Sequence, residues 1–529
     1  MQNFVKKHIE DVLEKEVVLE KPKDISLGHF ATPVAFSMAK ELRKNPMMIA
    51  QDLAAKFENS DIFEEVTSVK GFVNFKLSNN FLLSQLNNSL ELKEEFARGS
   101  KKNESILLEF VSANPTGPLH IGHARGAVFG DALLKVGKYL GYDVTSEYYV
   151  NDAGAQMQLL ATSLNLAARE FILNEEVEYP EQFYRGDYLI DIAKKCVDIY
   201  GKEVFHDSSK EEELALFAKD EVLNIIKKDM ADLGVTFDNY VSEKSLYSSW
   251  DDTKKVLEST GSMYNKDGKD FIKSTLHGDD ADRVVVRDNG VPTYLAGDII
   301  YHKNKYDRNF DRYINIWGAD HHGYIKRVKA AIEFLGNDSS KLEILLSQMV
   351  ALLQGGQPYK MSKRAGTVIL MSEIVEQIGS DALRFVFLTK KSDTHLEFDI
   401  DLLKNNDSSN PIFYINYAHA RINQLFKKAE LNISDVANES IDKINQDAKD
   451  LSFEALLLGS VLDEAFTKRD MQKITDYLHG LSAMTHKFYN EHKIVGIEEQ
   501  NQYLKVLSMV ALSIRTGLMV LGIKAKEVM

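Results

Sequence analysis

The sequence predicts a central α/β domain built on a parallel sheet, with a small α+β domain before it and an all-α helix bundle after it. Residues 1–100 combine helical spacing with a short β pair, residues 105–150 read as strand, helix and strand, and residues 405–529 show long helical periodicity. At roughly 100–200 residues per domain, the 529 residues allow about three or four domains.

The amino-terminal α+β domain contains two amphipathic stretches and a β pair. Apolar residues recur at helical spacing from Phe4 to Val17 and from Met47 to Phe57. Residues 66–75 read as two short strands that turn at Gly71. The charged run Arg98–Glu104 is expected to link this domain to the next.

The central domain, expected over residues 105–404, begins with a strand–helix–strand unit. Residues 106–111 read as a buried strand, His120 to Leu140 as a helix and Asp143 to Val150 as the next strand. This order implies a parallel sheet with a ligand site at the carboxyl ends of its strands.

The remainder of the central domain gives weaker signals. Residues 155–280 read as mostly helical and polar, and Arg283–Arg287 reads as a strand. Apolar runs typical of strands follow at Tyr294–Tyr301 and at Ile314–Trp317. A Gly- and Lys-rich loop between helices is expected at residues 357–372.

The C-terminal bundle is expected over residues 405–529. Its apolar stretch Val506–Ile523 has nearly the length of a membrane span, but Arg515 lies at the middle, where a charge is costly in a bilayer. A buried helix is therefore favoured over a membrane span. The amino-terminal residues show no apolar signal-peptide core, so we expect a cytoplasmic protein with no membrane partner.

Composition places the chain among ordinary globular proteins. Hydrophobic residues make up 44% and charged residues 27%, which excludes a disordered or collagen-like chain. The single cysteine, Cys196, excludes an internal disulfide and a cysteine-rich zinc site, so a reducing compartment is expected.

The net charge of −15 bears on the kind of partner. Taken alone it argues against nucleic acid, because phosphate binding relies on clustered Lys and Arg. Residues 1–100 hold 13 Lys and Arg against 15 Asp and Glu, and residues 405–529 hold 14 against 16. The acidity is therefore concentrated in the central domain, and the nearly neutral flanks leave room for a few basic residues that contact nucleic acid.

The first chemical motif lies where the first central strand ends and the helix begins, and comprises residues 113–123, Ala-Asn-Pro-Thr-Gly-Pro-Leu-His-Ile-Gly-His. A helix amino terminus offers free amides and a positive dipole end, which suit phosphate, and Gly122 lets a planar base approach the backbone. His120 and His123 lie on one face of the first turn, where two imidazoles can donate hydrogen bonds to phosphate oxygens. The alternative is a zinc pair, although zinc usually needs further protein ligands.

The second motif, residues 360–367, is Lys-Met-Ser-Lys-Arg-Ala-Gly-Thr. It is not a Walker phosphate loop, because the GxxxxGK[ST] pattern is absent. Lys360 and Lys363 flank a short loop and could hold a pyrophosphate leaving group. The alternative is a solvated basic loop.

Together, His-Ile-Gly-His at 120–123 and Lys-Met-Ser-Lys at 360–363 resemble the two signatures of class I aminoacyl-tRNA synthetases. Either match alone is weak, but the pair in this order around a strand–helix–strand unit is specific. The surroundings resemble the arginyl-tRNA synthetases over the whole chain. The segments that carry this likeness are Glu109–Thr116, Tyr148–Gly154, Gly278–Val284, Trp317–Tyr324 and Asp381–Phe385.

The resemblance implies a Rossmann-type catalytic domain over 105–404, a tRNA-contacting domain over 1–100 and a helical, DALR-type anticodon-binding domain over 405–529. The implied activity joins L-arginine to the tRNA for arginine through arginyl-adenylate, with Mg²⁺-bound ATP as a substrate and no permanently bound cofactor. It also implies a monomer and an activation step that needs tRNA. The acidic central domain suits attraction of a cationic amino acid.

The resemblance also assigns site residues. The expected catalytic residues are His120, His123, Lys360 and Lys363. The expected ATP-binding residues are Pro115, Gly117, His120, Gly122, His123, Gly318, Asp320, Met361, Ser362 and Lys363. The expected arginine-binding residues are Glu109, Ser112, Asn114, Tyr294 and Asp298.

Within the arginine site, Ser112 and Asn114 are expected to hold the α-amino and carboxylate end, and Tyr294 and Asp298 to line the side-chain pocket. A guanidinium needs paired carboxylate recognition, and Glu109 and Asp298 are the candidate acids. The alternative role for Asp298 is a helix N-cap.

Other interpretations stay open. The chain could be a synthetase for another amino acid, a non-catalytic tRNA-binding paralogue or a zinc hydrolase. Arginyl-tRNA synthetases often carry a degraded second motif, whereas Lys-Met-Ser-Lys is complete here, which favours catalysis. His321 and His322 are expected to support the site, with one of them favoured as a packing residue.

An aromatic and basic cluster lies near the start of the bundle, at Phe413, Tyr414, Tyr417, His419 and Arg421. Interleaved aromatic and basic side chains can stack on unpaired bases. The alternative, favoured for Phe413 and Tyr417, is a stripe in the core of the bundle.

Overall fold

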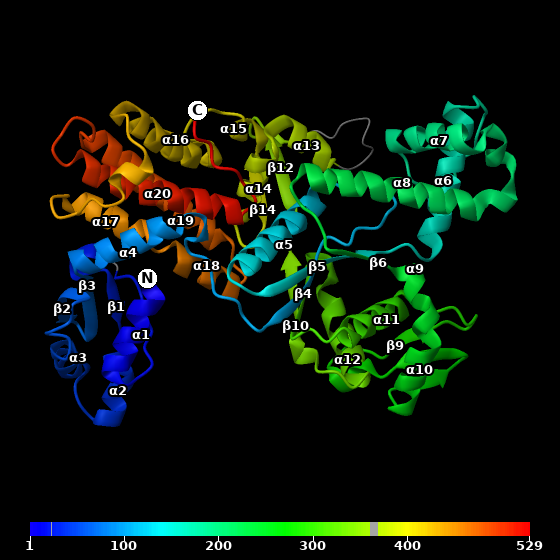
Figure 1. Ribbon diagram of the computed structural model, residues 1–529. Helices are drawn as coiled ribbons and strands as arrows, with labels where there is room; N and C mark the ends of the chain where they lie inside the picture. The colour runs from blue at the N-terminus through cyan, green and yellow to red at the C-terminus, as the bar shows by residue number, and fades with distance from the viewer. Residues whose placement is uncertain (23, 360–368) are drawn as a thin grey trace. The chain divides into compact units, whose positions relative to one another are not determined.

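The computed structural model describes residues 1–22, 24–359 and 369–529 (Figure 1). The chain forms two compact units. Residues Ser100–Asn405 form one, here called the sheet unit, and Met1–Gly99 together with Asn406–Met529 form the other, here called the helical unit. The Lys-Met-Ser-Lys motif at 360–363 lies outside the described residues.

The sheet unit is built on five parallel strands in the order β11-β10-β4-β5-β6, which confirms the predicted parallel sheet (Figure 1). The strand order reverses between β4 and β10, and the carboxyl ends at such a switch point form the ligand site of open α/β sheets. The strands are β4 (Ser105–Glu109), β5 (Asp143–Val150), β6 (Asn239–Ser242), β10 (Arg312–Gly318) and β11 (Leu342–Ser347).

Helix α5 (Ile121–Tyr139) follows β4, as the sequence predicts, and is buried along almost its whole length. Gly130 is required there, because a Cβ at this position would lie 2.3 Å from Cγ of Phe110, the residue after β4. The helix therefore lies close to the end of the strand, and its amino terminus is fixed at the switch point.

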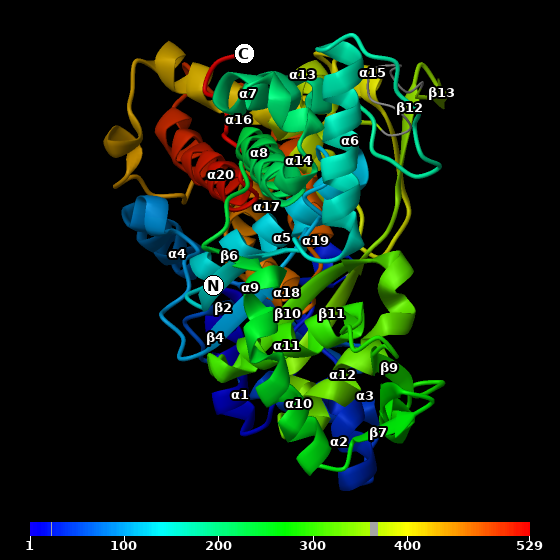
Figure 2. The same cartoon turned by 90° about the vertical axis from the view of Figure 1, so that its right-hand side faces the viewer.

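Three helices are inserted between β5 and β6, and they pack on one another (Figure 2). They are α6 (Ala155–Phe171), α7 (Asp187–Tyr200) and α8 (Glu211–Asp232). The polar, helical texture of residues 155–280 predicted these helices. It missed β6, because this edge strand is short and its residues Asn239 and Tyr240 are exposed.

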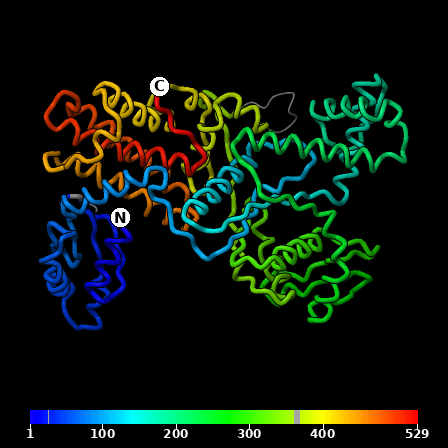
Figure 3. Tube along the Cα trace, in the orientation of Figure 1, coloured from blue at the N-terminus to red at the C-terminus, as the bar shows by residue number. Residues whose placement is uncertain are grey.

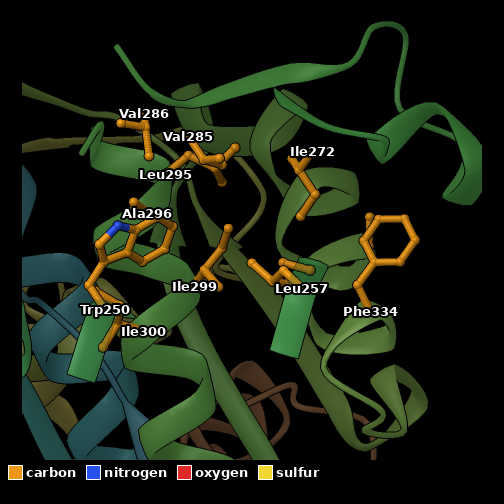
Figure 4. Packing of buried hydrophobic residues seen from close by; sticks show 12 residues of the cluster. Trp250, Leu257, Ile272, Val285, Val286, Leu295, Ala296, Ile299, Ile300 and Phe334 are labelled. Carbon is orange, nitrogen blue, oxygen red and sulfur yellow. The ribbon is translucent and has the colours of Figure 1, made fainter. Parts of the chain in front are cut away.

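A second insertion has its own hydrophobic core, formed by Trp250, Leu257, Ile272, Val285, Ile299 and neighbours (Figure 4). Its helices are α9 (Glu243–Leu246), α10 (Trp250–Ser259) and α11 (Tyr294–Asp307), and its antiparallel strands are β7 (Met263–Lys266), β8 (Lys269–Ile272) and β9 (Arg283–Val286). Helix α12 (Ile325–Phe334), which follows β10, packs against the same core. The strand expected at Arg283–Arg287 is confirmed. The strand-like interpretation of Tyr294–Tyr301 is wrong, because both faces of α11 are buried and its apolar run mimics a strand.

The last part of the sheet unit pairs β12 (Val350–Gln354) with β13 (Gln357–Pro358) and β14 (Leu396–Asp399). The helices here are α13 (Met371–Ile378), α14 (Ser380–Leu388) and α15 (Ile400–Leu403). The segment expected as a loop between helices at 357–372 thus begins in a strand and ends in a helix.

The Asp-Ala-Leu-Arg sequence at 381–384 lies in α14, inside the sheet unit. Arg384 is 1% exposed; its guanidinium pairs with Asp131 of α5 and donates a hydrogen bond to the Leu233 carbonyl at 3.0 Å. Lys135 also pairs with Asp131. This arginine therefore ties α14, the helix of the first motif and the end of α8 together.

In the helical unit, the amino-terminal segment forms a three-stranded antiparallel sheet covered by helices. The strands β2 (Phe63–Val69) and β3 (Phe72–Leu77) confirm the predicted pair that turns at Gly71. The remaining elements are α1 (Gln2–Leu13), β1 (Phe30–Thr32), α2 (Val34–Leu42), α3 (Pro46–Ala55) and α4 (Asn79–Leu92).

The carboxyl-terminal segment is the predicted bundle, with α16 (Pro411–Ala429), α17 (Gln446–Ala455), α18 (Leu458–Thr467), α19 (Gln472–Glu491) and α20 (Gln500–Val520). Figure 3 shows the amino-terminal and carboxyl-terminal segments side by side within the helical unit. Side chains join them: Lys505 contacts Asn87, Lys21 pairs with Glu454, and the rings of His29 and Phe453 lie 4.5 Å apart.

Helix α20 contains the apolar stretch that has the length of a membrane span. Of the helices that the structure describes, it alone has the length and hydropathy to cross a membrane, and 89% of its most apolar window is buried in the protein. Arg515 lies on its exposed side. The sequence prediction of a buried helix is confirmed.

Candidate active site

The loop after β4 places Ser112 beside the strand end. Val111 and Ser112 have φ values of 69° and 42°, a left-handed backbone that L residues adopt only when their surroundings impose it. The Ser112 hydroxyl donates a hydrogen bond to Glu109 Oε1 at 2.9 Å and accepts one from the Tyr149 amide at 3.1 Å. Both contacts fix the hydroxyl at the carboxyl ends of β4 and β5.

The two histidines of the first motif stack on each other at the start of α5, with ring centroids 3.7 Å apart. His120 Nδ1 accepts a hydrogen bond from the Gly122 amide at 3.1 Å, and His123 Nδ1 accepts one from the His120 amide at 3.4 Å. Since each Nδ1 is an acceptor, each ring carries its proton on Nε2. Both rings can therefore donate from Nε2 to a ligand.

Burial keeps these imidazoles neutral. It lowers the pKa of His120, and together with the neighbouring His120 it lowers the pKa of His123 to about 3. Both rings are therefore expected to be neutral donors at neutral and higher pH. The arrangement therefore suits stabilisation of developing charge by oriented dipoles rather than by imidazolium ions.

The backbone after the second motif lies against the first motif. The Ile121 amide donates to the Ile369 carbonyl at 2.9 Å, and the Met371 amide donates to the Leu119 carbonyl at 2.9 Å. The described chain thus resumes, directly after residues 360–368, beside the amino terminus of α5. The sequence alone could not show this pairing.

A cleft of about 580 Å³ opens over the first motif. One wall comes from the motif and includes Gly117, which is half-buried, and Asn114, which is exposed; the other comes from residues 184–188 at the start of α7. Tyr188 joins the walls by donating to the Thr116 carbonyl at 2.7 Å. Pro115 is buried behind the cleft. Sequence reasoning missed the wall at 184–188, since it carries no phosphate-binding pattern.

Gly318 and Asp320 lie at the carboxyl end of β10, across the switch point from β4. A Cβ at Gly318 would lie 2.5 Å from Oδ1 of Asp320, so the carboxylate folds back on the strand end. His321 and His322 are both exposed, and His321 lies over Trp317 with ring centroids 6.3 Å apart. The 3₁₀ helix that carries both histidines faces solvent, so the packing expected for one of them is the contact of His321 with the Trp317 ring rather than burial.

Asp298 lies in the second turn of α11, which begins at Tyr294. The N-cap of that helix is Thr293, so the alternative role of Asp298 as a cap is wrong. Tyr324 donates a hydrogen bond to Asp298 Oδ2 at 2.7 Å. Burial, followed by the nearby carboxylates of Glu243 and Glu109, raises the pKa of Asp298 to about 7.

Glu243 is a second acid in this region that sequence reasoning missed. It is 3% exposed; its Oε1 accepts from the Tyr247 hydroxyl at 2.9 Å, and its Oε2 has no hydrogen-bond partner among the described residues. Burial raises its pKa. A Cβ at Gly297 would lie 2.6 Å from Glu243 Oε1, so Glu243 lies directly beside the turn that carries Asp298.

Asp152 explains how Glu243 is held. Its carboxylate accepts hydrogen bonds from the Ser242 hydroxyl at 2.8 Å and from the Lys244 amide at 2.9 Å, one on each side of Glu243. Asp152 belongs to the Tyr148–Gly154 motif. The motif drew attention to Asp152, but the sequence could not show that Glu243, 91 residues later, lies beside it.

Glu109 was expected to contact substrate, yet both of its oxygens have protein partners. Oε1 accepts from Ser112, and Oε2 pairs with Lys305 of α11. The side chain is 4% exposed. Glu109 therefore holds the Ser112 hydroxyl in place. Asp298 and Glu243 are the acids of this region that have no ion-pair partner in the described parts of the chain.

The helical unit contains a second cavity, of about 890 Å³. Phe413 and Tyr417 stack on its wall with centroids 5.9 Å apart, and Arg421 lies over the rings of Tyr417 and Tyr489 at 4.3 and 4.6 Å. The core stripe of α16 is formed by Ile412, Ile415, Ala418 and Ile422 instead. The prediction that Phe413 and Tyr417 belong to that stripe is therefore wrong.

A zinc site at the two histidines would need further ligands close to them. Among the described residues, the group of side chains close enough to share a metal ion is Asp447, Glu491 and His492, in the helical unit. His120 and His123 are not part of it, and their Nδ1 atoms already accept backbone hydrogen bonds.

Comparison with known proteins agrees with this architecture. The model of the class I (R) tRNA synthetase catalytic domain matches residues 85–426, the DALR anticodon binding domain matches 415–529, and the arginyl tRNA synthetase N terminal domain matches 1–77. A solved structure, Thermus thermophilus arginyl-tRNA synthetase, has the same fold, with a TM-score of 0.80 at 20% identity and with all of both chains covered.

Two relatives are similar over their full lengths. The arginine–tRNA ligase of Aliarcobacter butzleri is 70% identical over 529 residues, and that of a Nitratiruptor species is 55% identical over 527, each covering all of both chains. The catalytic-domain family matches more than half of this chain, and the full-length relatives are arginine–tRNA ligases. The chain therefore belongs to the arginyl-tRNA synthetases, class I ligases that use ATP to attach arginine to its tRNA.

Proposed function

We propose that the reaction takes place at the carboxyl ends of β4 and β10, with His120 and His123 donating from Nε2 to ATP phosphate oxygens. The arginine carboxylate attacks the α-phosphate, pyrophosphate leaves, and the terminal adenosine hydroxyl of the tRNA then takes the arginyl group. Side chains form no covalent bond to substrate here, so positioning and charge stabilisation carry the catalysis. ATP enters as its Mg²⁺ complex, and no cofactor stays bound.

The observation that carries the proposal is a pair of neighbouring acids, the half-buried Asp298 and the buried Glu243. Neither acid forms an ion pair among the described residues, Glu243 Oε2 has no hydrogen-bond partner there, and charges left unpaired in this way are costly unless a ligand neutralises them. A guanidinium offers five donors in a plane and fits such a pair. In this assignment Ser112 and Asn114 hold the α-amino and carboxylate end, and Tyr294 covers the pocket.

The test of substrate identity is direct. The purified chain is given total tRNA, ATP and one amino acid at a time, and the esterified amino acid is measured. Arginine is the expected product. Charging with lysine, glutamate or cysteine in preference to arginine would contradict the assignment of the pocket. Omitting tRNA should abolish arginine-dependent pyrophosphate exchange, as in the family.

We also propose that Lys360, Met361, Ser362 and Lys363 act on the phosphates, with both lysines on the leaving pyrophosphate. Ile369, six residues beyond Lys363, accepts a hydrogen bond from the Ile121 amide at the start of α5, and six residues span at most about 20 Å. This short separation along the chain supports the assignment of the second motif to the phosphates. Gly318 and Asp320, at the neighbouring strand end, are proposed for the ribose.

Lys363→Ala is expected to lower kcat about 10²–10³-fold while the KM for arginine stays within about twofold, because the lysine stabilises charge that develops on the leaving group. Steady-state aminoacylation with arginine varied measures both constants. Lys360→Ala, measured in parallel, is expected to behave in the same way. Normal turnover of the Lys363 variant would remove this residue from the site.

We propose that the helical unit binds the tRNA, with the carboxyl-terminal bundle reading the anticodon and the amino-terminal domain contacting the rest of the molecule. Its second cavity combines stacked rings with a guanidinium, which suits an unpaired base. The protein is proposed to act as a cytoplasmic monomer without a membrane partner.

Arg421→Met is expected to raise the KM for tRNA about tenfold and to leave the KM for arginine unchanged, because the cavity loses both a charge and a stacking surface. Aminoacylation with tRNA varied at two salt concentrations measures the effect. Lys427→Met removes an exposed charge from the same helix, away from the cavity, and is the matched control. Equal effects of the two changes would indicate general electrostatics rather than a base site.

A further inference from the structure

Lys305, on α11, carries its charge inside the protein, where the residue is 0% exposed. An ammonium group placed there needs charged or polar partners. It pairs with Glu109 of β4, donates a hydrogen bond to Asn315 Oδ1 of β10 at 2.8 Å, and lies 4.4 Å from the centroid of the Tyr301 ring. These elements meet at the switch point of the sheet.

From Lys305 a chain of hydrogen bonds runs in two directions. Toward β4, Glu109 accepts from Lys305 and from the Ser112 hydroxyl. Toward α11, Asn315 contacts His302 Nε2 at 3.1 Å, and His302 Nδ1 contacts the Asp298 carbonyl at 2.8 Å. The chain therefore begins at Ser112 and ends at the backbone of Asp298.

The polarity of this chain is consistent throughout. Because Asn315 Oδ1 accepts from Lys305, its Nδ2 is the group that faces His302 and donates to Nε2. That leaves the proton of His302 on Nδ1, from which it donates to the Asp298 carbonyl. Burial, followed by the charge of Lys305, lowers the pKa of His302 to about 3, which keeps this single tautomer neutral.

We propose that Lys305 is a positioning residue for arginine, which fixes the separation between the group that holds the backbone end of the substrate and the group that binds its guanidinium. The inference rests on the proposed roles of Ser112 and Asp298. Lys305 is buried behind Glu109 and acts only through its neighbours. Loss of its ammonium frees Glu109 and Ser112 at one end and removes the anchor of Asn315 and His302 at the other.

The first test is steady-state aminoacylation by Lys305→Met, a change that keeps the length of the side chain. The KM for arginine is expected to rise about tenfold or more, while the KM for ATP and the KM for tRNA stay within about twofold. If Lys305 only stabilised the fold, its loss would lower the amount of active enzyme and therefore kcat, without a selective rise in the KM for arginine. An unchanged KM for arginine overturns the inference.

The second readout is the pH profile of kcat/KM for arginine. The titratable groups facing Asp298 are Glu109 from β4, Tyr149 from β5, Glu243 from α9, Tyr247 after α9, Lys305 from α11 and Tyr324 before α12. Lys305 is the cation in this set, and it lowers the pKa of Asp298. Its removal is expected to move the acid limb to higher pH by about half to one unit, and an unmoved limb counts against the inference.

A matched control separates this effect from loss of a buried lysine. Lys505 of α20 is also 0% exposed, and its ammonium contacts Asn87 and the carbonyls of Ala437 and Glu439 in the helical unit. Lys505→Met is expected to lower Tm while the KM for arginine and the acid limb stay unchanged. A rise in that KM equal to the rise in Lys305→Met would refute the specific role.

A second variant keeps the proposal testable if Lys305→Met does not fold. Asn315→Ala keeps the Lys305–Glu109 pair but cuts the link to His302, so the KM for arginine is expected to rise about three- to tenfold with an unmoved acid limb. If the proposed arginine site itself is wrong, Asp298→Asn will retain normal arginine binding, which distinguishes that failure from failure of the Lys305 role alone. If Asp298→Asn loses arginine binding while Lys305→Met and Asn315→Ala retain it, only the role of Lys305 fails.

Discussion

Asp298→Asn is expected to lower kcat/KM for arginine about 10²–10³-fold, mainly through KM, because truncating one partner of a desolvated charge pair costs about 2–5 kcal/mol. The asparagine still accepts the hydrogen bond from Tyr324, so the local packing is retained. Aminoacylation with arginine varied measures the change. Asp307→Asn alters an exposed acid on the same helix, which pairs with Lys303, and is expected to leave kcat/KM unchanged.

The pH dependence of the wild type checks the same residue. Burial and two neighbouring carboxylates raise the pKa of Asp298 to about 7, so below that pH the carboxyl group is mostly protonated and arginine must displace the proton. The value of kcat/KM for arginine should fall as the pH drops below 7 and reach a plateau above 8. The asparagine variant should lack this limb; a limb that persists unchanged assigns it to another group.

The same substitution should stabilise the protein in the absence of arginine. The folded-state pKa of Asp298 is raised above the ordinary value of 3.8, so its charged form opposes folding at pH above about 7 and has no effect below about pH 4. Asp298→Asn is therefore expected to raise Tm by a few degrees at pH 8, measured without substrate. A lowered Tm at pH 8 contradicts this account of the pocket.

Arg384→Met should have the largest effect on stability. The guanidinium and the Asp131 carboxylate are both 1% exposed, and removing one partner of such a buried pair costs about 3–5 kcal/mol. The Leu233 carbonyl also loses its donor. The expected result is a Tm lowered by about 6–20 °C, at about 2–4 °C per kcal/mol, in thermal unfolding followed by circular dichroism.

Two further variants make the result interpretable. Asp131→Asn combined with Arg384→Met removes the uncompensated charge and should regain part of the lost Tm, although Lys135 then loses its own partner. Arg312→Met breaks a more exposed pair with Glu104 in the same unit and should cost about 1 kcal/mol or less. If Arg384→Met and Arg312→Met lower Tm equally, burial of the pair is not what matters.

The parts of the fold that the sequence predicted are those in which one segment carries its own signal. The β4–α5–β5 unit is an example, because apolar runs, a Pro- and Gly-rich turn and a helical stripe follow one another within about 45 residues. Short edge strands such as β6 carry too few apolar residues to be seen. Helix α11 was partly misread, because a helix buried on all sides loses its amphipathic period.

The candidate site was predictable to the same extent. His120, His123 and Ser112 lie within 12 residues of one another, and most of their hydrogen bonds are to nearby residues. Glu243 and Lys305 were missed, because the acids beside them, Asp298 and Glu109, lie 55 and 196 residues away in sequence. A single Glu or Lys in a polar segment is normally interpreted as a surface residue, because charged residues are mostly exposed. For Glu243 and Lys305 that interpretation is wrong.

The helical unit is discontinuous, since its two segments flank the 306 residues of the sheet unit. During synthesis, the amino-terminal domain leaves the ribosome first but must wait for α17 and α20 before His29 and Asn87 can meet Phe453 and Lys505. The sheet unit can fold during that interval. The anchoring of the amino-terminal domain is thus a late, long-range event, and a chain that stops short of α20 would carry a complete catalytic sheet beside an amino-terminal domain without its docking surface.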